Sequence, residues 1–287
     1  MSKIYFNKIT ILGVGLIGAS FALAMKKNGL CKEIVGFGRN RKNLLNAKEK
    51  GIIDSFGADP ASACKDSDLI ILATPVGTFQ DLTKKALPSF KKGAVITDAG
   101  SVKGDLVYEI EKIMPEGVYY IGGHPIAGSD RSGIDSANAE LFTGAKCIIT
   151  PTKNSNAGAL RIVTDLWKSL GSDVITMGPE KHDRIYAAVS HLPHLIAYSI
   201  INTIAGIDSS YLEFCGQGFK DTTRIALSSP ELWRDISLMN KDNLIEMISI
   251  FQKNLDTLSQ YLRASDSGSL ESEFRKARTL REGIGQN

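Results

Sequence analysis

The fold of this chain is decided near its start by the stretch Ile9-Thr10-Ile11-Leu12-Gly13-Val14-Gly15-Leu16-Ile17-Gly18. The short β-branched and aliphatic run before Gly13 predicts a buried strand. Ile17–Lys27 is rich in Ala, Leu and Met, and predicts a helix that ends at Asn28-Gly29. A G-x-G-x-x-G pattern between a strand and a helix is typical of a turn that binds the pyrophosphate of a dinucleotide.

Apolar strands that alternate with helices continue outward from this turn. Further strands are expected at Glu33–Phe37, Leu69–Ala73, Val95–Asp98, Tyr119–Gly122, Lys146–Thr150 and Asp173–Met177, and helices at Lys42–Lys50 and Asn156–Leu170. Apolar strands in alternation with helices indicate parallel βαβ units whose sheet is covered on both faces. The sequence therefore predicts an α/β fold, with an N-terminal Rossmann-type, doubly wound, mostly parallel sheet over residues 1–178.

The pattern changes after Gly178-Pro179. Helices are expected at Glu180–Ile204, Asp221–Leu227, Glu231–Asn240, Asp242–Arg263 and Leu270–Arg281. We therefore predict an all-α C-terminal domain over residues 179–287. Its apolar content exceeds what a short helical appendage needs, which favours a homodimer formed through these helices.

Composition excludes several other classes of protein. The 287 residues carry a formal net charge of +3, from 34 basic and 31 acidic side chains, which does not favour nucleic-acid binding. The four cysteines are scattered, so neither a disulfide framework nor a zinc site is expected. No apolar run approaches the length of about 20 residues that a membrane span needs, and the first residues do not resemble a signal peptide. A cytoplasmic protein is expected.

The end of the second strand predicts which dinucleotide binds. NAD sites usually carry an Asp or Glu there, which bonds the ribose 2′-hydroxyl. This chain has Gly38-Arg39-Asn40-Arg41 instead. An arginine can pair with a 2′-phosphate through two hydrogen bonds, so we predict NADP rather than NAD. The alternative is that both arginines are solvated charges at a helix start.

Polar residues follow other strands at the carboxyl edge of the sheet, where ligands of open α/β sheets bind. Pro75 is expected to end its strand, and the Thr74 backbone is expected beside the nicotinamide ribose. Ser101 is expected either to cap the next helix or to face the ligand. His124 follows two glycines in what the pattern predicts to be a loop, and we expect it to be catalytic.

Candidate substrate-binding residues lie in the helical part. His191 and His194 are three apart and can share one helix face, and substrate contact is favoured over a capping or core role. Arg224 suits a carboxylate, because its planar guanidinium offers paired donors; Asp221 can hold it as an i,i+3 pair, and a surface salt bridge is the alternative. For Trp233, a position in the hydrophobic core and a contact with the ligand are equally favoured. No metal is expected.

These motifs together resemble the prephenate/arogenate dehydrogenase family of tyrosine biosynthesis. The specific runs are His-Pro-Ile-Ala-Gly-Ser at 124–129 and Ser-His-Leu-Pro-His at 190–194. Supporting runs are Ala-Thr-Pro at 73–75, Asp-Ala-Gly-Ser-Val-Lys at 98–103, Gly-Phe-Lys-Asp-Thr-Thr-Arg at 218–224 and Trp-Arg-Asp at 233–235. They occur in the family's order over most of the chain. The resemblance implies the oxidative decarboxylation of prephenate or arogenate, with hydride transfer to a nicotinamide cofactor.

The resemblance also implies a set of site residues. His124 takes the proton of the ring hydroxyl, Ser101 orients that hydroxyl, and Arg224 pairs with a substrate carboxylate. Trp233 reaches the pocket of the partner subunit in a helical dimer. Substrate-binding positions are Ser129, Ser190, His191, His194, Lys220, Arg224 and Trp233; cofactor-binding positions are Gly13, Gly15, Leu16, Ile17, Gly18, Gly38, Arg39, Arg41, Thr74 and Pro75. We expect no fused regulatory or mutase domain, so any inhibition by tyrosine is expected at the active site.

Two other functions remain open at this point. A β-hydroxyacid dehydrogenase shares a nucleotide domain followed by helices, but commonly relies on a catalytic lysine in the helical part. A non-catalytic NADP-binding regulator needs the glycine turn without His124, Ser101 and Arg224.

Overall fold

A computed structural model of the chain describes residues 5–128 and 133–284. The chain divides into two compact units, Met1–Asn240 and Lys241–Asn287, which are described separately below.

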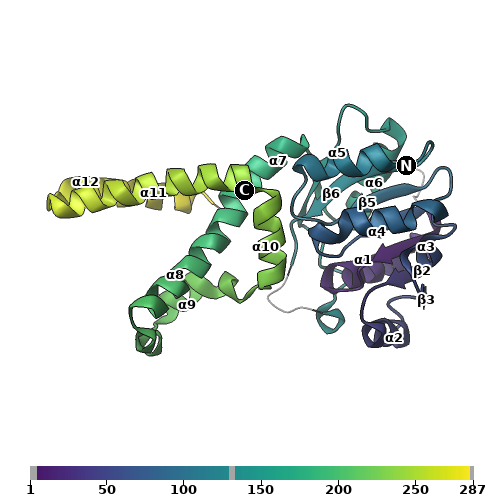
Figure 1. Cartoon of the computed structure of the whole chain (residues 1–287), viewed down its shortest axis with the longest axis horizontal. Coiled ribbons are helices and arrows are strands. Elements are labelled where there is room, and N and C mark those ends of the chain that lie inside the picture. Colours follow the sequence, from purple (N-terminus) through teal and green to yellow (C-terminus); the bar gives the residue numbers. More distant parts are fainter. Residues whose placement is uncertain (1–4, 129–132, 285–287) are drawn as a thin grey trace. The chain divides into compact units, whose positions relative to one another are not determined.

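The first unit is built on one eight-stranded sheet, of order β3-β2-β1-β4-β5-β6-β7-β8 (Figure 1). The strands are β1 (Phe6–Leu12), β2 (Cys31–Phe37), β3 (Ser55–Phe56), β4 (Leu69–Leu72), β5 (Val95–Asp98), β6 (Tyr119–Pro125), β7 (Lys146–Thr150) and β8 (Asp173–Thr176). All neighbours are parallel except β6 and β7, so β7 and β8 run against the other strands. The doubly wound, mostly parallel sheet is confirmed.

Helices cover both faces of this sheet (Figure 1). One face packs against α1 (Leu16–Lys27), α2 (Arg41–Glu49) and α6 (Ala157–Ser169), and the other against α3 (Pro60–Cys64), α4 (Phe79–Ala86) and α5 (Gly104–Ile113). Short 3₁₀ turns occur at η1 (Val76–Thr78), η2 (Leu87–Ser89) and η3 (Ile134–Ser136). Successive residues of β4 point into opposite cores, which explains why the whole strand is apolar.

Only helices follow Thr176 in the described part of the chain. In the first unit they are α7 (Pro179–Tyr186), the π-helical turn η4 (Ala187–His191), α8 (Leu192–Asp208), η5 (Ser209–Phe214), α9 (Gln217–Thr223), η6 (Arg224–Leu227) and α10 (Pro230–Met239). Two of them, α7 and α10, begin at a proline, and the Ser229 side chain before α10 accepts a hydrogen bond from the N–H of Leu232.

Residues 180–204 are helical, as predicted, but a π turn at Ala187–His191 widens the helix between α7 and α8. The N–H of Leu192 donates to the carbonyl of Ala187, five residues back. Pro193 follows and has no N–H to continue the regular i→i−4 pattern. The proline therefore explains why the helix widens here, and π turns of this kind occur frequently at functional sites.

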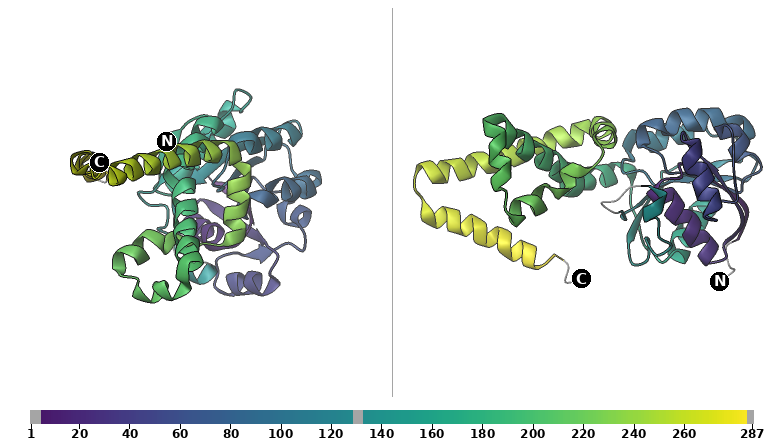
Figure 2. Two further views of the ribbon diagram at one scale, coloured as in Figure 1. Left: turned by 60° about the vertical axis from the view of Figure 1, so that its left-hand side comes forward. Right: turned by 90° about the horizontal axis from the view of Figure 1, so that it is seen from below.

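The second unit is a helical hairpin. Its helices are α11 (Lys241–Arg263) and α12 (Ser267–Glu282), and the chain folds back between them (Figure 2). Ser265 has a φ of 52° in this turn, and the Asp266 carboxylate caps α12 by accepting from the Ser269 N–H. The predicted domain boundary at 178/179 differs from the division at 240/241 and stays a prediction. None of the described helices has both the length and the apolar character required to cross a membrane.

Candidate active site

A cavity of about 300 Å³ lies where the strand order reverses between β1 and β4. Ligands of open α/β sheets bind at such a switch point. The cavity is lined by Gly13, Val14, Gly15, Phe37, Gly38, Arg39, Asn40, Asn43, Ala73, Thr74, Pro75, Thr78 and Leu82. It therefore brings together the predicted glycine turn, the end of β2 and Thr74-Pro75.

The glycine turn fits a dinucleotide. Gly13 has a φ of 108°, and a Cβ there would lie 2.6 Å from the carbonyl carbon of Ala73. A Cβ at Gly18 would lie 2.1 Å from the carbonyl oxygen of Gly13, so both positions require glycine. A Cβ at Gly15 would meet nothing within 4 Å. The Gly15 backbone at the start of α1 is thus open to a phosphate, where the helix N-terminus favours negative charge. Leu16 and Ile17 begin α1 without lining the cavity.

The end of β2 carries no carboxylate into the cavity. Arg39 lines it, whereas the Arg41 guanidinium lies 5.9 Å above the ring of Phe56. The sequence analysis missed Asn43, whose side-chain amide donates to the carbonyl of Val14 at 2.7 Å. That bond ties α2 to the glycine turn.

His124 does not lie in a loop, as predicted, but in strand β6, opposite Ile148 of β7. The two glycines before it do not form a turn; they allow atoms of neighbouring strands to approach the backbone of β6 closely. A Cβ at Gly123 would lie 2.8 Å from the carbonyl oxygen of Asp98, and one at Gly122 would lie 2.4 Å from Thr150 Oγ1. The strand leaves the His124 ring 9% exposed.

A chain of hydrogen bonds connects His124 to a buried carboxylate. His124 Nδ1 lies 2.8 Å from Nε2 of His182, and Nδ1 of His182 lies 2.7 Å from Oδ1 of Asp183. His182 is fully buried and Asp183 is 2% exposed. Neither residue was predicted from the sequence. Their only signal was the scarcity of histidine, since the chain has four.

This chain of bonds determines which nitrogens carry protons. The Asp183 carboxylate accepts from the N–H of Lys103 at 2.8 Å and from His182 Nδ1–H. Nε2 of His182 is then the acceptor for His124 Nδ1–H. The lone pair of His124 therefore resides on Nε2, which is the arrangement of a general base.

Other predicted residues surround this chain. His191 is 1% exposed, and its ring hydrogen-bonds with the Ser101 backbone and lies 3.1 Å from the Asn240 side-chain nitrogen. Asn240 also donates to the carbonyl of Asp183 at 2.9 Å. The capping role considered for Ser101 is wrong, because α5 starts three residues later, at Gly104, and Lys103 occupies its N-cap position without a side-chain capping bond.

His194, Trp233 and Arg224 form a second group. The rings of His194 and Trp233 are stacked with their centroids 3.5 Å apart. Trp233 is 8% exposed, so it packs within its own chain. Burial is the main cause that lowers the pKa of His194, and the charge of Arg224 contributes. Nδ1 of His194 also lies 2.9 Å from the carbonyl oxygen of Ser190.

Arg224 and Lys220 line a further cavity of about 630 Å³ between α8, η5 and α9. Its walls include Tyr198 and Phe219. Asp221 accepts from the Gln217 side chain at 2.8 Å rather than serving as the predicted i,i+3 partner of Arg224.

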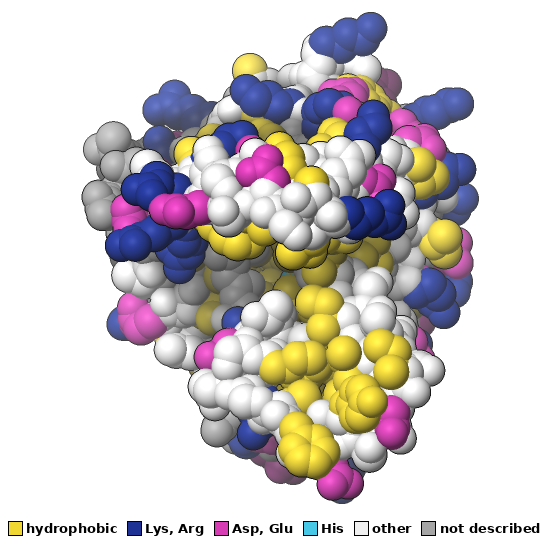
Figure 3. Space-filling view, turned by 90° about the vertical axis from the view of Figure 1, so that its left-hand side faces the viewer, with side chains coloured by type: hydrophobic (Ala, Val, Ile, Leu, Met, Phe, Trp, Pro, Cys, Tyr) yellow, Lys and Arg dark blue, Asp and Glu magenta, His cyan; other side chains and the backbone are white. Residues whose placement is uncertain are grey.

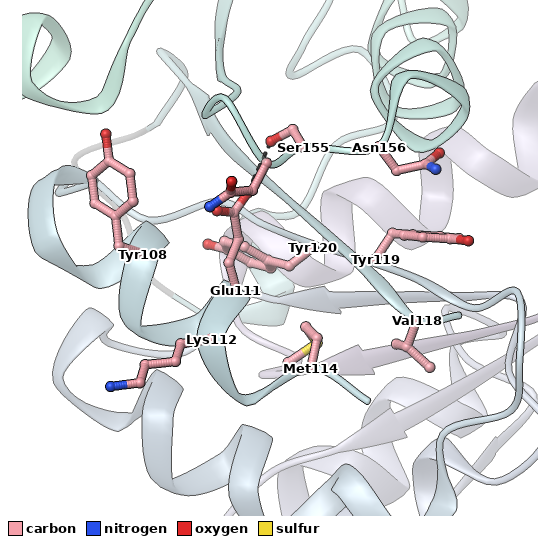
Figure 4. A pocket seen from close by; sticks show the side chains of 10 residues that line it. Tyr108, Glu111, Lys112, Met114, Val118, Tyr119, Tyr120, Ser155 and Asn156 are labelled. Carbon is pink, nitrogen blue, oxygen red and sulfur yellow. Dashed lines mark hydrogen bonds between the residues drawn. The ribbon is translucent and has the colours of Figure 1, made fainter. Parts of the chain in front are cut away.

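Three remaining features complete the comparison. Ser129 lies outside the described residues. Within the described ranges, no group of three or more His, Cys, Asp or Glu side chains is arranged to hold a metal ion. A cavity of about 370 Å³ between α5, β6 and the residues before α6 contains no predicted site residue (Figure 4). There Glu111 accepts from Thr152 and Ser155 hydroxyls at 2.7 and 2.9 Å.

The histidines make stability sensitive to acid. Burial is the main cause that lowers the pKa of His124, of His182 to about 2, of His191 to about 4, and of His194. The unfolded chain takes up these protons near pH 6.5 and the folded chain does not, so stability is lost as the pH falls below that value. Burial raises the pKa of Asp183 to about 6. This shift stabilises the fold as the pH falls, and so offsets the destabilising effect of one histidine. We expect the melting temperature to fall by about 3 °C or more per pH unit below 6.5. A flat or rising melting temperature between pH 6.5 and 5 would contradict this.

A doubly wound sheet with a glycine turn at its switch point, followed by a helical segment, is the architecture of an NAD(P)-dependent dehydrogenase. A family model described as "Prephenate dehydrogenase, nucleotide-binding domain" matches residues 21–176, and one described as "Prephenate dehydrogenase, dimerization domain" matches residues 178–276. The chain therefore belongs to the prephenate/arogenate dehydrogenase family.

Individual relatives agree with this. Prephenate dehydrogenase of Bacillus subtilis is 34% identical over 97% of this chain and 76% of its own length. Cyclohexadienyl dehydrogenase of Zymomonas mobilis is 31% identical over 96% of this chain and 95% of its own length. The crystal structure of prephenate dehydrogenase from Aquifex aeolicus with hydroxyphenyl propionate and NAD+ has a TM-score of 0.93. It is 35% identical over 99% of this chain and 100% of that one.

Proposed function

We propose that the protein catalyses the oxidative decarboxylation of prephenate, arogenate or both, with His124 as the general base. The observation that carries this proposal is the hydrogen-bonded chain from His124 through His182 to Asp183. Family membership favours this reaction over a β-hydroxyacid dehydrogenase or a non-catalytic regulator.

The reaction needs one base and one hydride acceptor. A bound nicotinamide dinucleotide supplies the acceptor. The ring carbon that bears the hydroxyl loses hydride, and the hydroxyl proton passes to Nε2 of His124. The ring carboxylate leaves as carbon dioxide, and its bonding electrons complete the aromatic ring as a phenolate, which takes the proton back from Nε2 of His124. Asp183 and His182 hold the ring of His124 in the tautomer that accepts this proton, and Ser101 orients the hydroxyl.

Substrate binding is assigned to the helical part. Arg224 and Lys220 supply positive charge for the substrate carboxylates, because a guanidinium binds a carboxylate through paired hydrogen bonds. His194 and Ser190 are assigned to substrate contact as well, and Trp233 fixes the plane of His194 by stacking on it. The remaining predicted positions, Ser129 and His191, belong to the same proposal.

NADP is the proposed cofactor. Gly38 stands where NAD sites usually carry a carboxylate, and Arg39 lines the same cavity. The guanidinium suits a 2′-phosphate.

A homodimer is proposed as well. Hydrophobic side chains gather on the surface of the lobe that α8, η5, α9 and η6 form (Figure 3). Ile207 of α8, Tyr211 and Phe214 of η5 and Leu227 of η6 have exposures of 65%, 52%, 84% and 88%. Patches of this kind are typical of protein interfaces. The cytoplasmic location stays a prediction.

Absorbance at 340 nm tests the function directly. The protein is mixed with NADP or NAD and with prephenate or arogenate. We expect reduction of the cofactor with at least one substrate, and a higher kcat/KM for NADP than for NAD. The absence of turnover with every combination would refute the function, and a preference for NAD would refute the cofactor assignment alone.

Arg224→Ala is expected to raise the KM for the cyclohexadienyl substrate by about 10- to 100-fold and to change kcat much less, because a charge-assisted carboxylate contact is lost. Steady-state kinetics measure both parameters. The control is Arg161→Ala, whose side chain is 84% exposed on α6. Equal losses of kcat and 1/KM, together with a lower melting temperature, would indicate misfolding instead.

A further inference from the structure

Lys103 is a buried charge that the mechanism above does not use. Its side chain is fully buried, and its ammonium forms an ion pair with the equally buried Asp98. Lysine is almost never fully buried unless it is paired. The pair lies within the run Asp98–Lys103, which the sequence analysis singled out but to which it gave no role beyond Ser101.

The Asp98 carboxylate holds two segments of backbone. Oδ1 accepts from the Gly100 N–H at 2.7 Å, and Oδ2 accepts from the Gly123 N–H at 3.2 Å. The Tyr120 hydroxyl also donates to Oδ2, at 2.5 Å. Gly100 directly precedes Ser101 and Gly123 directly precedes His124. One carboxylate thus fixes the backbone immediately before both proposed catalytic residues.

Lys103 also contacts Asp183, the carboxylate at the far end of the hydrogen-bonded chain that begins at His124. Its backbone N–H donates to Oδ1 of Asp183, the oxygen that also bonds His182. Its side chain neutralises Asp98, and its backbone orients Asp183. The residue therefore connects the support of His124 with the carboxylate that ends the histidine chain.

We propose that Lys103 is a positioning residue for the base: through its ion pair with Asp98 and its bond to Asp183, it fixes His124 in the geometry that proton transfer requires. This inference rests on the proposed function of His124. Lys103 itself does not touch the substrate in this account.

Two physical arguments support a role beyond stability. A buried ion pair contributes little net stability, because desolvation offsets the attraction, and apolar or neutral replacements of both partners are often tolerated. The ammonium also lies close enough to the histidines that its charge, after burial, helps to lower the pKa of His124 and His182. Both rings are thereby kept neutral, which leaves the lone pair on Nε2 of His124 unprotonated.

The test is the double variant Asp98→Asn/Lys103→Met, which removes both charges and keeps similar shapes. Whichever way the new amide turns, either the Gly100 or the Gly123 N–H loses its acceptor. We expect kcat to fall about 10- to 100-fold, since small displacements of a catalytic group have effects of this size. The KM for NADP should change less than about threefold, because the glycine turn is untouched.

The matched control is Asp68→Asn/Lys91→Met. Asp68 likewise pairs with a lysine and accepts two backbone N–H bonds, from Asn7 and Lys8 at 2.6 and 3.0 Å, but it does so at the amino ends of the strands. This control is expected to lower the melting temperature without lowering kcat. A folded Asp98/Lys103 variant with unchanged kcat would overturn the inference, and so would equal losses of kcat in both double variants.

A milder change covers the case in which the test variant fails to fold. Tyr120→Phe removes one hydrogen bond to Oδ2 of Asp98, the oxygen that also holds the Gly123 N–H, and so loosens the link through which Lys103 acts on His124. We expect kcat to fall about threefold or more at unchanged KM. Unchanged kcat would contradict the inference. Wild-type protein without turnover would refute the proposed function instead, so the two failures are distinguishable.

Discussion

Replacing His124 with asparagine is expected to lower kcat by about 10²- to 10⁴-fold, the usual contribution of a general base. KM for both substrates should change little, because the amide has similar size and the binding groups remain. The physical reason is that Asn has no lone pair of comparable basicity to take the hydroxyl proton. Steady-state and single-turnover kinetics at pH 7.5 measure the effect.

Tyr119→Phe, on the same strand β6, controls for disturbance of the sheet and is expected to keep kcat close to that of the wild type. The assignment of His124 as the base would be wrong if His124→Asn retained more than about a tenth of wild-type kcat while folding normally.

Asp183→Asn is expected to have the second-largest effect, a loss of about 10²- to 10⁴-fold in kcat. The amide preserves the shape but not the charge that holds His182 Nδ1–H, so the tautomers of both rings are no longer fixed. In Ser-His-Asp enzymes the same exchange costs about 10⁴-fold for this reason. Kinetics over pH 6 to 9 measure the loss.

Glu180→Gln provides the control on the same helix, α7. Its carboxylate is exposed and accepts from the Tyr108 hydroxyl at 2.6 Å, so kcat should stay within about twofold of the wild type. Similar kcat values for Asp183→Asn and Glu180→Gln would show that the buried carboxylate does not act on the base.

The fold was largely predictable because its signals are local. The apolar strands, the glycine turn and the helices after Gly178 all follow from hydrophobic periodicity and from the glycine and proline residues that end each element. Strand β3 is only two residues long, too short to produce such a signal. The two glycines before His124 were interpreted as part of a loop for a different reason. Glycine permits both a turn and a close approach of other backbone atoms, and the atoms that approach here, from Asp98 and Thr150, come from distant parts of the chain.

The site was predictable only in part. His124 and Arg224 stand in distinctive runs, whereas His182 and Asp183 lie in an ordinary-looking amphipathic helix. Their role depends on the packing of α7 against the sheet edge, which brings His182 to His124 across 58 residues of sequence. Lys103 illustrates the same point, because its burial and its pairing with Asp98 arise from tertiary structure.

The most direct test of the account is a crystal structure of the protein with NADP and a 4-hydroxyphenyl analogue of the product. We predict that Nε2 of His124 lies within about 2.6–3.2 Å of the phenolic oxygen, with Nδ1 still bonded to His182. A His124 ring directed away from that oxygen, with a different side chain in hydrogen-bond contact with it, would contradict the central claim.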